Sequence, residues 1–472
     1  MRAWSGQKVV IIGAARQGLA LARYLLQHGA SVLITDQRPL EALEPARQSL
    51  SGVPGAAERL SWVVGGHPFS LLEGATLVCP SGGVPLTLPL IEQAQRLGLP
   101  LSNDSQVFLD AASCKVIGIT GSAGKTTTTT LVGRIAQAAV DLPGRAVPYR
   151  RVWVGGNIGS PLIADVDQMQ PDDLAVMELS SFQLEIMTRS PQVAAILNIT
   201  PNHLDRHATM EAYTAAKARL LAFQTPLDRA VLGRDDPGAW SLVGQVKGQL
   251  FSFGFTPLPA DACGAFLYQD DICVCAEHGK HQATWVMTRD EVSLRGEHNL
   301  LNVMAACTVA AAAALPVEAM RLGVRGFTGV PHRLEFVRSW GGADWYNDSI
   351  ATAPERTMAA IRSFHEPLVL LAGGRDKKLP WDEFAGLVRQ RVDHLIVFGE
   401  AADIILQAVE PNQADRLKVT RCKGLHEAVD CAAQVVKPGG VVLLSPGGTS
   451  FDEFQDFEER GECFARWVRE LP

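Results

Sequence analysis

The sequence contains no apolar run long enough to cross a membrane. A membrane-spanning helix needs roughly 18 to 20 apolar residues, and the best candidate, the Ala-rich stretch at 305–315, is too short. The first residues lead directly into a strand-like segment, without a basic segment, an apolar stretch and a cleavage site before it. We therefore expect a cytoplasmic protein that is not attached to a membrane.

An excess of positive charge is also missing. The chain has 50 acidic residues against 43 lysines and arginines, and its formal net charge is −7. Nucleic acids and anionic membranes attract proteins that carry a positive surface. We therefore expect neither as a partner, and any phosphate site has to be a local feature of the chain.

Cysteine pairs are absent as well. None of the nine cysteines belongs to a Cys-x-x-Cys pair, and their spacing matches neither a zinc site nor a disulfide framework. The nine are Cys79, Cys114, Cys263, Cys273, Cys275, Cys307, Cys422, Cys431 and Cys463. We expect reduced thiols, as is usual in the cytosol.

What the chain does contain is typical of a large globular protein. Hydrophobic residues make up 47% and charged residues 20%, and 43 glycines and 27 prolines suit a fold rich in turns. At roughly 100 to 200 residues per domain, a chain of 472 residues predicts about three domains. We place them at 1–111, 112–327 and 328–472, and we expect a monomer.

The first predicted domain begins in the manner of a Rossmann-like fold. The apolar run Lys8-Val-Val-Ile-Ile is followed by a turn at Gly13, a helical pattern and a second apolar run that ends at Asp36. Ala15 stands where a dinucleotide-binding turn has its middle glycine. The turn is therefore either a nucleotide site or an unliganded α/β turn. Asp36 either contacts a ribose or a uracil, or begins the next turn.

Strand-like and helical segments continue to alternate through the rest of the chain. The runs that predict strands lie at 174–177, 193–198, 368–372, 394–398 and 441–444. An Ala-rich helical stretch at 299–315 closes the second domain. Such alternation favours mostly parallel sheets covered by helices. We therefore expect three α/β domains, a Rossmann-like one at each end and a phosphate-loop ATPase type in the middle.

The strongest single motif is a phosphate loop. It reads Gly118-Ile-Thr-Gly-Ser-Ala-Gly-Lys-Thr-Thr and lies between a predicted strand and a predicted helix. In such a loop the backbone N–H groups surround phosphate oxygens, the lysine neutralises the β- and γ-phosphates, and the hydroxyl after it can hold Mg2+. The predicted ATP-binding residues here are Gly121, Ser122, Gly124, Lys125, Thr126 and Thr127.

Polar residues follow two further predicted strands. Glu178 comes directly after the run at 174–177, where a phosphate-bound metal ion would lie, and hard cations prefer carboxylate oxygens. A surface glutamate that begins a helix is the alternative. His203, Asp205 and Arg206 follow the run at 193–198. A lone histidine is more often structural than a metal ligand, but this cluster favours a site.

Two other residues are weak signals when taken alone. Lys217 lies in a helical stretch, which by itself predicts a solvent-exposed side chain. Asn157 lies in the segment Gly155-Gly-Asn-Ile-Gly, which by spacing alone predicts only a turn.

Taken together, these segments resemble the Mur ligase family. The matching segments are Gly118-Ile-Thr-Gly-Ser-Ala-Gly-Lys-Thr-Thr, Glu178-Leu-Ser-Ser-Phe-Gln, Asn198-Ile-Thr-Pro-Asn-His-Leu-Asp-Arg, Gly296-Glu-His-Asn-Leu-Leu-Asn and Pro331-His-Arg-Leu-Glu. The run Leu444-Ser-Pro-Gly-Gly-Thr-Ser-Phe-Asp-Glu-Phe-Gln-Asp-Phe and the short N-terminal domain are similar to the family members that add D-glutamate. Both features differ from folylpolyglutamate synthase.

The resemblance implies an ATP- and Mg2+-dependent ligase of peptidoglycan synthesis. ATP would phosphorylate the carboxylate of UDP-N-acetylmuramoyl-L-alanine to an acyl phosphate, which the amino group of D-glutamate attacks with loss of phosphate. Such catalysis depends on positioning and charge neutralisation. The alternatives are a family member that adds L-alanine, a diamino acid or a glutamyl tail, a nucleotide-dependent switch, and a dehydrogenase, which only the N-terminal glycine turn suggests.

The resemblance also implies roles for individual residues. Thr126 and Glu178 would hold one Mg2+, and His203 and a carbamate on Lys217 a second, because a carbamate supplies a carboxylate-like ligand. Lys125, His203 and Lys217 are thus the expected catalytic residues. The further nucleotide contacts are Asn299, Asn302, Arg333 and Asp348, in a site that closure of the domains would assemble. The expected substrate contacts are Ala15, Arg16, Gln17, Asp36, Gly83 and Asn157 for the UDP-muramoyl part, and Thr352, Lys377, Ser450 and Phe457 for D-glutamate.

The chain departs from the family pattern at several positions. Ala123 replaces an Asn before Gly-Lys-Thr, and Ser81-Gly-Gly replaces Ser-Pro-Gly. Gly447-Gly448 replaces a small Ala-Cys pair. Ile350 stands where a Lys is found in Asp-Ser-Lys-Ala-Thr, which removes one expected amino-acid contact. The run Arg375-Asp-Lys-Lys leaves open which basic residue faces the substrate.

Overall fold

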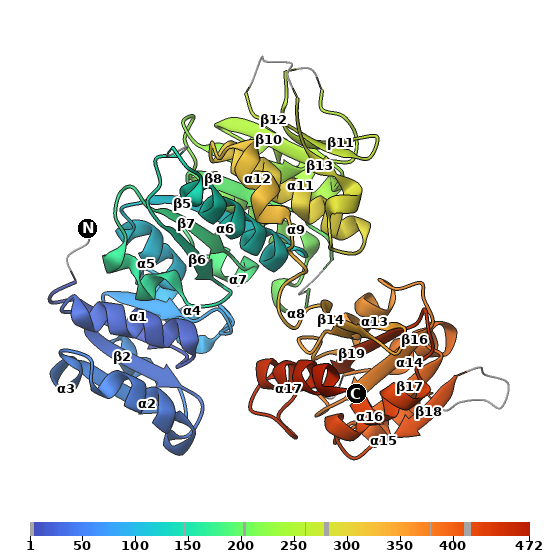
Figure 1. Cartoon of the computed structure of the whole chain (residues 1–472). Coiled ribbons are helices and arrows are strands. Elements are labelled where there is room, and N and C mark those ends of the chain that lie inside the picture. The colour runs from blue at the N-terminus through green and yellow to red at the C-terminus, as the bar shows by residue number, and fades with distance from the viewer. Residues whose placement is uncertain are drawn as a thin grey trace. The chain divides into compact units, whose positions relative to one another are not determined.

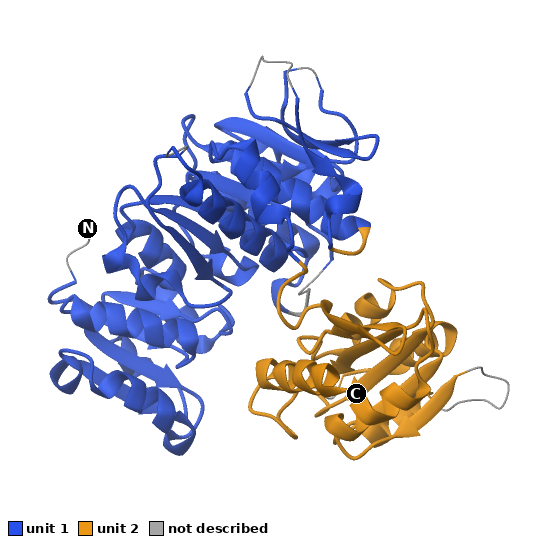
Figure 2. Ribbon diagram, viewed as in Figure 1, with its two compact units in different colours: residues 1–293, 297–327 blue, residues 294–296, 328–472 orange. Residues whose placement is uncertain are grey.

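The computed structural model contains three α/β domains, each built around one sheet. It describes residues 4–144, 147–201, 204–259, 261–277, 283–377, 379–409 and 417–472. The sheets have four, nine and six strands (Figure 1). The chain divides into two compact units, one of residues Met1–Ser293 and Glu297–Phe327 and the other of Leu294–Gly296 and Thr328–Pro472 (Figure 2). The expected α/β fold class with three domains is confirmed.

The first sheet is parallel, with the order β3-β2-β1-β4. Its strands are β1 (Lys8–Ile12), β2 (Ser31–Asp36), β3 (Leu60–Val64) and β4 (Leu77–Pro80). Its helices are α1 (Arg16–Gln27), α2 (Glu44–Ser51), α3 (Ala56–Arg59), α4 (Pro89–Arg96) and α5 (Asp104–Ala111). Helix α1 approaches the turn after β1 so closely that a Cβ on Gly18 would lie 2.2 Å from the Gly13 carbonyl oxygen. A glycine is therefore required there.

The middle sheet has the order β13-β12-β11-β10-β9-β8-β5-β7-β6. Its strands are β5 (Lys115–Thr120), β6 (Val152–Gly156), β7 (Leu174–Glu178), β8 (Val193–Ile196), β9 (Arg229–Gly233), β10 (Gln249–Gly254), β11 (Cys263–Tyr268), β12 (Asp271–Cys275) and β13 (Thr284–Thr288). Strands β5 to β11 pair in parallel, and β12 and β13 extend the sheet with antiparallel pairs. The central strands are buried on both faces, which explains their continuous apolar runs.

Helices cover both faces of the middle sheet. They are α6 (Lys125–Asp141), α7 (Ser181–Leu184), α8 (Leu204–His207), α9 (Met210–Ala222), α10 (Pro237–Trp240), α11 (Glu297–Ala312) and α12 (Val317–Val324). Helices α6, α11 and α12 pack against one another over the sheet (Figure 1), while α9 packs against β8 and α7. The strands therefore place the segments after β5, β7 and β8 at one edge of the sheet, where phosphate loops lie in such folds.

The first two domains share one hydrophobic core. Helices α1 and α5 of the first domain pack against the short 3-10 helix at Leu162–Ala164 of the middle domain. Buried side chains of this common core include Leu21, Phe108 and Ile163. This packing fixes the first domain beside the phosphate loop and accounts for the single compact unit.

The third sheet has the order β14-β15-β19-β16-β17-β18, and among its described strand pairs only β14–β15 is antiparallel. Its strands are β14 (Glu335–Trp340), β15 (Ala343–Asn347), β16 (Leu368–Gly373), β17 (His394–Phe398), β18 (Lys418–Arg421) and β19 (Val441–Gly447). Its helices are α13 (Pro354–Ile361), α14 (Asp382–Arg391), α15 (Ala402–Val409), α16 (Leu425–Val435) and α17 (Phe457–Glu470). The loops after β15, β16 and β19 therefore meet at one edge.

The described residues show neither a disulfide nor a membrane-spanning helix. None of the nine cysteines, all of which are described, forms a disulfide. Over the described part of the chain, no helix has both the length and the apolar character that crossing a membrane would require.

Candidate active site

The phosphate loop joins β5 to α6 and is held in shape by the segment after β8. The Ala123 N–H donates to Asn198 Oδ1 at 2.8 Å, and Asn198 Nδ2 returns a hydrogen bond to the Ala123 carbonyl at 3.1 Å. Ser122 Oγ donates to the Thr200 carbonyl at 3.0 Å and lies 3.0 Å from the Tyr213 hydroxyl. The loop is therefore fixed by the protein itself, with its backbone ready for a phosphate.

Lys125, the first residue of α6, lies over this loop. Its Nζ donates to the Gly121 carbonyl at 2.8 Å and to the Ser122 carbonyl at 3.3 Å. These two hydrogen bonds hold the ammonium group against the backbone of the loop. The expected position of Lys125, beside the phosphates of a bound nucleotide, fits this geometry.

Asn302 of α11 lies beside the loop, and Asn299 is hydrogen-bonded to it. Gly124 has φ +80°, and a Cβ on it would lie only 2.1 Å from Asn302 Oδ1. Asn302 is buried and its Nδ2 donates to Asn299 Oδ1 at 3.0 Å. The left-handed backbone and the close contact together require glycine at 124. Packing of α11 against α6 thus brings a segment that is distant in the sequence to the phosphate loop.

Glu178 ends β7 and offers one unused oxygen to a cation. The side chain is 1% exposed, so the alternative of a surface glutamate is wrong. Its Oε1 accepts a hydrogen bond from Asn157 Nδ2 at 2.8 Å, whereas no described residue donates to the buried Oε2. A buried carboxylate oxygen without a donor costs roughly 1 to 3 kcal/mol. A hard cation would relieve this cost, so the residue fits Mg2+.

Lys217 lies on α9 and points into the protein. Its side chain is 1% exposed, so the solvent-exposed position that the helix alone predicts is wrong. Nζ donates to the Gly121 carbonyl at 3.0 Å and to Thr120 Oγ1 at 3.4 Å. Burial, and then the positive charge of Lys125, lower the pKa of Lys217 to about 6. A neutral amine beside the phosphate loop is the form that reacts with CO2.

His207, at the end of α8, belongs to a buried group of polar and aromatic contacts that local sequence patterns do not indicate. His207 Nε2 lies 2.9 Å from Ser181 Oγ, and its Nδ1 lies 3.1 Å from Glu185 Oε1. Its ring stacks on Phe182 with 5.3 Å between centroids and lies 5.1 Å from the Tyr213 ring. These contacts join α7, α8 and α9 to one another. His203 itself lies outside the described residues.

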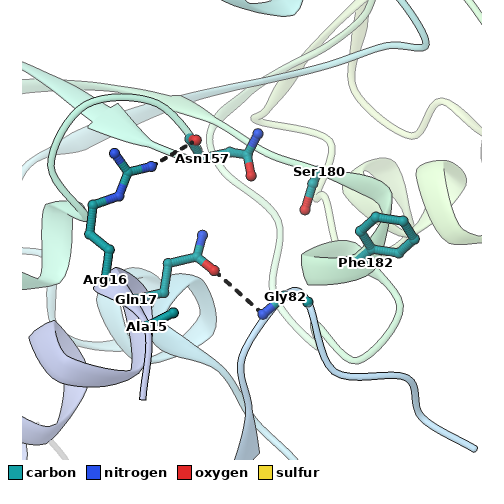
Figure 3. Close-up of a pocket in the computed structure, with 8 residues that line it drawn as sticks. Ala15, Arg16, Gln17, Gly82, Asn157, Ser180 and Phe182 are labelled. Atoms are coloured by element: carbon teal, nitrogen blue, oxygen red, sulfur yellow. Dashed lines mark hydrogen bonds between the residues drawn. The ribbon is translucent and has the colours of Figure 1, made fainter. Parts of the chain in front are cut away.

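An open cleft of about 320 Å3 lies between the first and middle domains (Figure 3). Ala15, Arg16, Gln17, Gly82 and Gly83 line it from the first domain, and Asn157, Ser180 and Phe182 from the middle domain. Five of these residues, all except Gly82, Ser180 and Phe182, belong to the expected substrate contacts.

Cross-domain hydrogen bonds hold this cleft together. Arg16 Nη2 donates to the Asn157 carbonyl at 3.4 Å, as Figure 3 shows. Arg206 Nη1 donates to the Gly83 carbonyl at 3.1 Å, and its guanidinium lies 4.5 Å from the centre of the Phe182 ring. The cleft therefore joins the glycine turn of the first domain directly to the Glu178 segment.

Asp36, at the end of β2, is engaged by its own domain. It accepts hydrogen bonds from the Ala14 N–H at 2.8 Å and from Arg38 Nη2 at 2.8 Å. The bonds from Arg38 hold the pKa of Asp36 well below its usual range. Asp36 thus stays ionised and fixes the turn that carries Ala15, and it does not line the cleft of about 320 Å3.

In the second unit, Asp348 follows β15 and is buried. Its Oδ2 accepts a hydrogen bond from Ser445 Oγ at 2.8 Å, and its Oδ1 accepts one from the Leu334 N–H at 3.2 Å. Burial raises the pKa of Asp348 to about 7, although the hydrogen bonds and the charges of Arg333 and Arg356 oppose the rise. The expected nucleotide contacts Arg333 and Asp348 thus lie close enough to interact.

The loops of the third sheet also bring Thr352 and Lys377 together. Lys377 Nζ donates to Thr352 Oγ1 at 3.1 Å. Arg375 instead forms a bidentate ion pair with Glu400, with hydrogen bonds of 2.8 and 3.0 Å. Of the described residues in this basic run, Lys377 is therefore the one placed beside another expected substrate contact; Lys378 lies outside the described residues.

Ser450 and Phe457 lie further along the same edge. Ser450 is buried, and its carbonyl accepts a hydrogen bond from the Phe454 N–H at 2.8 Å. Phe457 begins α17, its carbonyl accepts a hydrogen bond from Ser349 Oγ at 2.9 Å, and its ring lies 6.3 Å from the ring of His332. Neither contacts Thr352 or Lys377 through a hydrogen bond in the described structure.

Comparison with known proteins identifies the family. Three family models match: the Mur ligase MurD-like N-terminal domain over residues 7–102, the Mur ligase middle domain over 119–310 and the Mur ligase glutamate ligase domain over 332–448. Curated relatives named UDP-N-acetylmuramoylalanine--D-glutamate ligase include one from Symbiobacterium thermophilum, 39% identical over 98% of both chains. Another, from Pelotomaculum thermopropionicum, is 40% identical over 100% of this chain and 99% of its own.

Solved structures agree with the fold at lower sequence identity. UDP-N-acetylmuramate-alanine ligase MurC from Thermotoga maritima has a TM-score of 0.56 at 17% identity, over 98% of this chain and 99% of its own. MurF ligase from Thermotoga maritima in complex with ADP has a TM-score of 0.55 at 17% identity, over 99% and 96%. From the family models and the near-full-length relatives, the chain belongs to the Mur ligase family of ATP-dependent amide ligases, with a MurD-like N-terminal domain.

Proposed function

We propose that this protein joins D-glutamate to UDP-N-acetylmuramoyl-L-alanine in peptidoglycan synthesis, with conversion of ATP to ADP and phosphate. The observation that carries the proposal is the agreement along the whole chain with D-glutamate ligases, at 39% identity over 98% of both chains in one case. The MurD-like N-terminal domain at 7–102 supports the same assignment. It argues against family members that add another amino acid.

The phosphate loop binds ATP in this proposal. Backbone N–H groups from Gly124 to Thr127 donate to the phosphate oxygens, and Lys125 neutralises the charge that develops during transfer. Asn299 and Asn302 contact the nucleotide from α11. Arg333 and Asp348 are the contacts that we assign to the second unit.

Thr126 and Glu178 are the residues that would hold Mg2+ beside the phosphates, with His203 and a carbamate on Lys217 for a second ion. The donor-free Oε2 of Glu178 supports the first assignment. When bound, the ions would neutralise phosphate charge. The buried amine of Lys217, whose lowered pKa favours the neutral form, supports the assignment of the second ion. A neutral amine can attack CO2 and release a proton to form the carbamate.

The cleft between the first and middle domains takes the UDP-muramoyl substrate. Arg16 offers a cation to the diphosphate, and Ala15 lines the cleft beside it. Gln17, Gly83 and Asn157 complete this surface. Asp36 stabilises the turn that carries Ala15, because it accepts a hydrogen bond from the Ala14 N–H.

D-glutamate binds at the loops of the third sheet. Lys377 supplies a cation and Thr352 a hydroxyl, the kinds of group that bind a dicarboxylic amino acid. Ser450 and Phe457 are the further contacts that we assign. Each of these residues lies in a loop or helix start at the carboxyl edge of the sheet.

The reaction then runs in two steps. A carboxylate oxygen of the muramoyl-L-alanine substrate attacks the γ-phosphorus of ATP, and ADP leaves, which gives an acyl phosphate. The amine of D-glutamate attacks the acyl carbon, loses a proton, and phosphate leaves. The residues act by positioning the reactants and neutralising charge, and none forms a covalent bond with the substrate.

A panel of amino acids tests the substrate assignment. Phosphate release from ATP with Mg2+ and UDP-N-acetylmuramoyl-L-alanine is measured with D-glutamate, L-glutamate, L-alanine or meso-diaminopimelate in separate reactions. We expect release with D-glutamate alone. Release with a different amino acid would contradict the assignment of D-glutamate and leave the ligase chemistry in place.

A further inference from the structure

Four cationic side chains gather at the loops of the third sheet, where Asp348 is the carboxylate that interacts electrostatically with Arg333 and Arg356. Strands β15, β19 and β16 are neighbours and parallel, so the loops after them share one edge. The cations at this edge are Arg333, Arg356, Lys377 and Arg460. Within the described part of the chain, none of the four forms an ion pair with a carboxylate. Such a group is typical of an anion site.

These cations are close enough to repel one another. Lys377 is coupled to Arg356 and to Arg460, whose positive charges, after burial, lower the pKa of Lys377. Arg460 is fully buried, and its hydrogen bonds to described residues go to neutral acceptors, with Nη1 3.1 Å from the Gly448 carbonyl and Nη2 2.8 Å from the Ser349 carbonyl. The repulsion among these cations is unfavourable, and a bound anion would reduce it.

Of these cations, Arg356 is the one that contacts Ile350. It lies in the first turn of α13, and its side chain is exposed. Its Nη1 donates to the Ile350 carbonyl at 3.3 Å. Ile350 is the residue that stands where the family pattern has a lysine. The guanidinium of Arg356 therefore lies beside the one position at which the chain has lost an expected positive charge.

We propose that Arg356 supplies the positive charge that Ile350 lacks and binds a carboxylate of the incoming dicarboxylic amino acid beside Lys377. The inference rests on the proposed function. It identifies Arg356 as a residue that determines amino-acid specificity, which the family pattern at Asp348 to Thr352 does not reveal. A guanidinium suits this role because it can form two parallel hydrogen bonds with one carboxylate.

A phosphate group of ATP or of the acyl phosphate has similar chemistry, so the test has to separate the two ligands. Arg356→Gln keeps a donor for the Ile350 carbonyl and removes the charge, whereas Arg356→Lys keeps the charge. Arg362→Gln is the matched control, because Arg362 is an exposed arginine just after the same helix. The double variant Arg356→Gln/Ile350→Lys moves the charge back to the family position.

Steady-state KM and kcat are measured for all three substrates with each variant. A charge-assisted hydrogen bond contributes about 10- to 100-fold in binding. We expect Arg356→Gln to raise the KM for D-glutamate by about that factor, with the KM for ATP and for the UDP substrate close to wild type. Arg356→Lys should retain most of the affinity, Arg362→Gln should change nothing, and Ile350→Lys should recover the loss.

Several outcomes would overturn the inference. An unchanged KM for D-glutamate in Arg356→Gln would show that the guanidinium only supports the loop. A loss that Ile350→Lys does not recover would mean the same. A rise confined to the KM for ATP would assign Arg356 to the phosphate. A wild-type enzyme that does not use D-glutamate at all would overturn the proposed function, and this is seen before any variant is measured.

Discussion

Replacing Gly124 by alanine should damage the nucleotide site more than it damages the fold. Gly124 has φ +80°, and its missing Cβ would lie 2.1 Å from Asn302 Oδ1. The alanine therefore has two effects, a strained backbone and a displaced asparagine. Gly98 provides the matched control, since it has φ +70° and no atom within 4 Å of the Cβ that alanine would add.

The two effects have different sizes. A left-handed backbone costs a non-glycine residue about 1 to 2 kcal/mol, and both variants carry this cost. Gly124→Ala also has to move Asn302, which breaks the hydrogen bond to Asn299, for about 1 kcal/mol more. The same movement disturbs the nucleotide contacts, and each 1.4 kcal/mol lost there is about a tenfold change in affinity.

The assay combines thermal unfolding with the KM for ATP. Both variants should unfold at a slightly lower temperature than the wild type. Only Gly124→Ala should raise the KM for ATP, by about tenfold or more, while Gly98→Ala leaves it unchanged. An equal KM for ATP in the two variants would refute the reasoning that Asn302 and the loop form one nucleotide site.

Three further predictions concern buried groups. Glu178→Gln keeps an acceptor for Asn157 and removes a buried charge, so this variant should unfold at or above the wild-type temperature. The Mg2+ concentration that it needs for half-maximal activity should rise at least about tenfold. A lower unfolding temperature with normal Mg2+ dependence would contradict this. Wild-type protein given 13C-labelled bicarbonate at pH 8 should show a carbamate signal by NMR that Lys217→Met lacks; a signal of equal size in both would place the carbamate elsewhere. Arg460→Met leaves the carbonyls of Gly448 and Ser349 without their donor, and it should lower the free energy of unfolding by about 2 to 5 kcal/mol in denaturant. Arg466→Met, at an exposed position of the same helix, should have little effect.

Much of the fold could be predicted from local patterns. Buried parallel strands appear in sequence as continuous apolar runs, so β7, β8, β16 and β17 were expected close to their observed bounds. The phosphate loop is equally local, because strand, glycine turn and helix follow one another within a few residues. The ends of elements were less accurate: the strand expected at 193–198 ends at Ile196, since the residues after it turn to hold the phosphate loop.

The environment of the site residues could not be predicted from local patterns. Lys217 is buried because α9 is covered by both β8 and α7, and only the tertiary packing reveals this. Local patterns do not indicate His207 for the same reason, since its partners Ser181 and Glu185 belong to the segment around α7. Ser180 and Phe182 line the cleft and were part of a recognised motif, but the motif does not say which of its side chains face the substrate.

Product stoichiometry tests the central claim most directly. ATP, UDP-N-acetylmuramoyl-L-alanine and D-glutamate are incubated with the protein and Mg2+, and ADP, phosphate and the adduct are measured together by mass spectrometry and phosphate assay. The account predicts equal amounts of all three and an adduct heavier than the UDP substrate by one glutamate minus one water. ADP and phosphate formed without the adduct, or independently of D-glutamate, would contradict it.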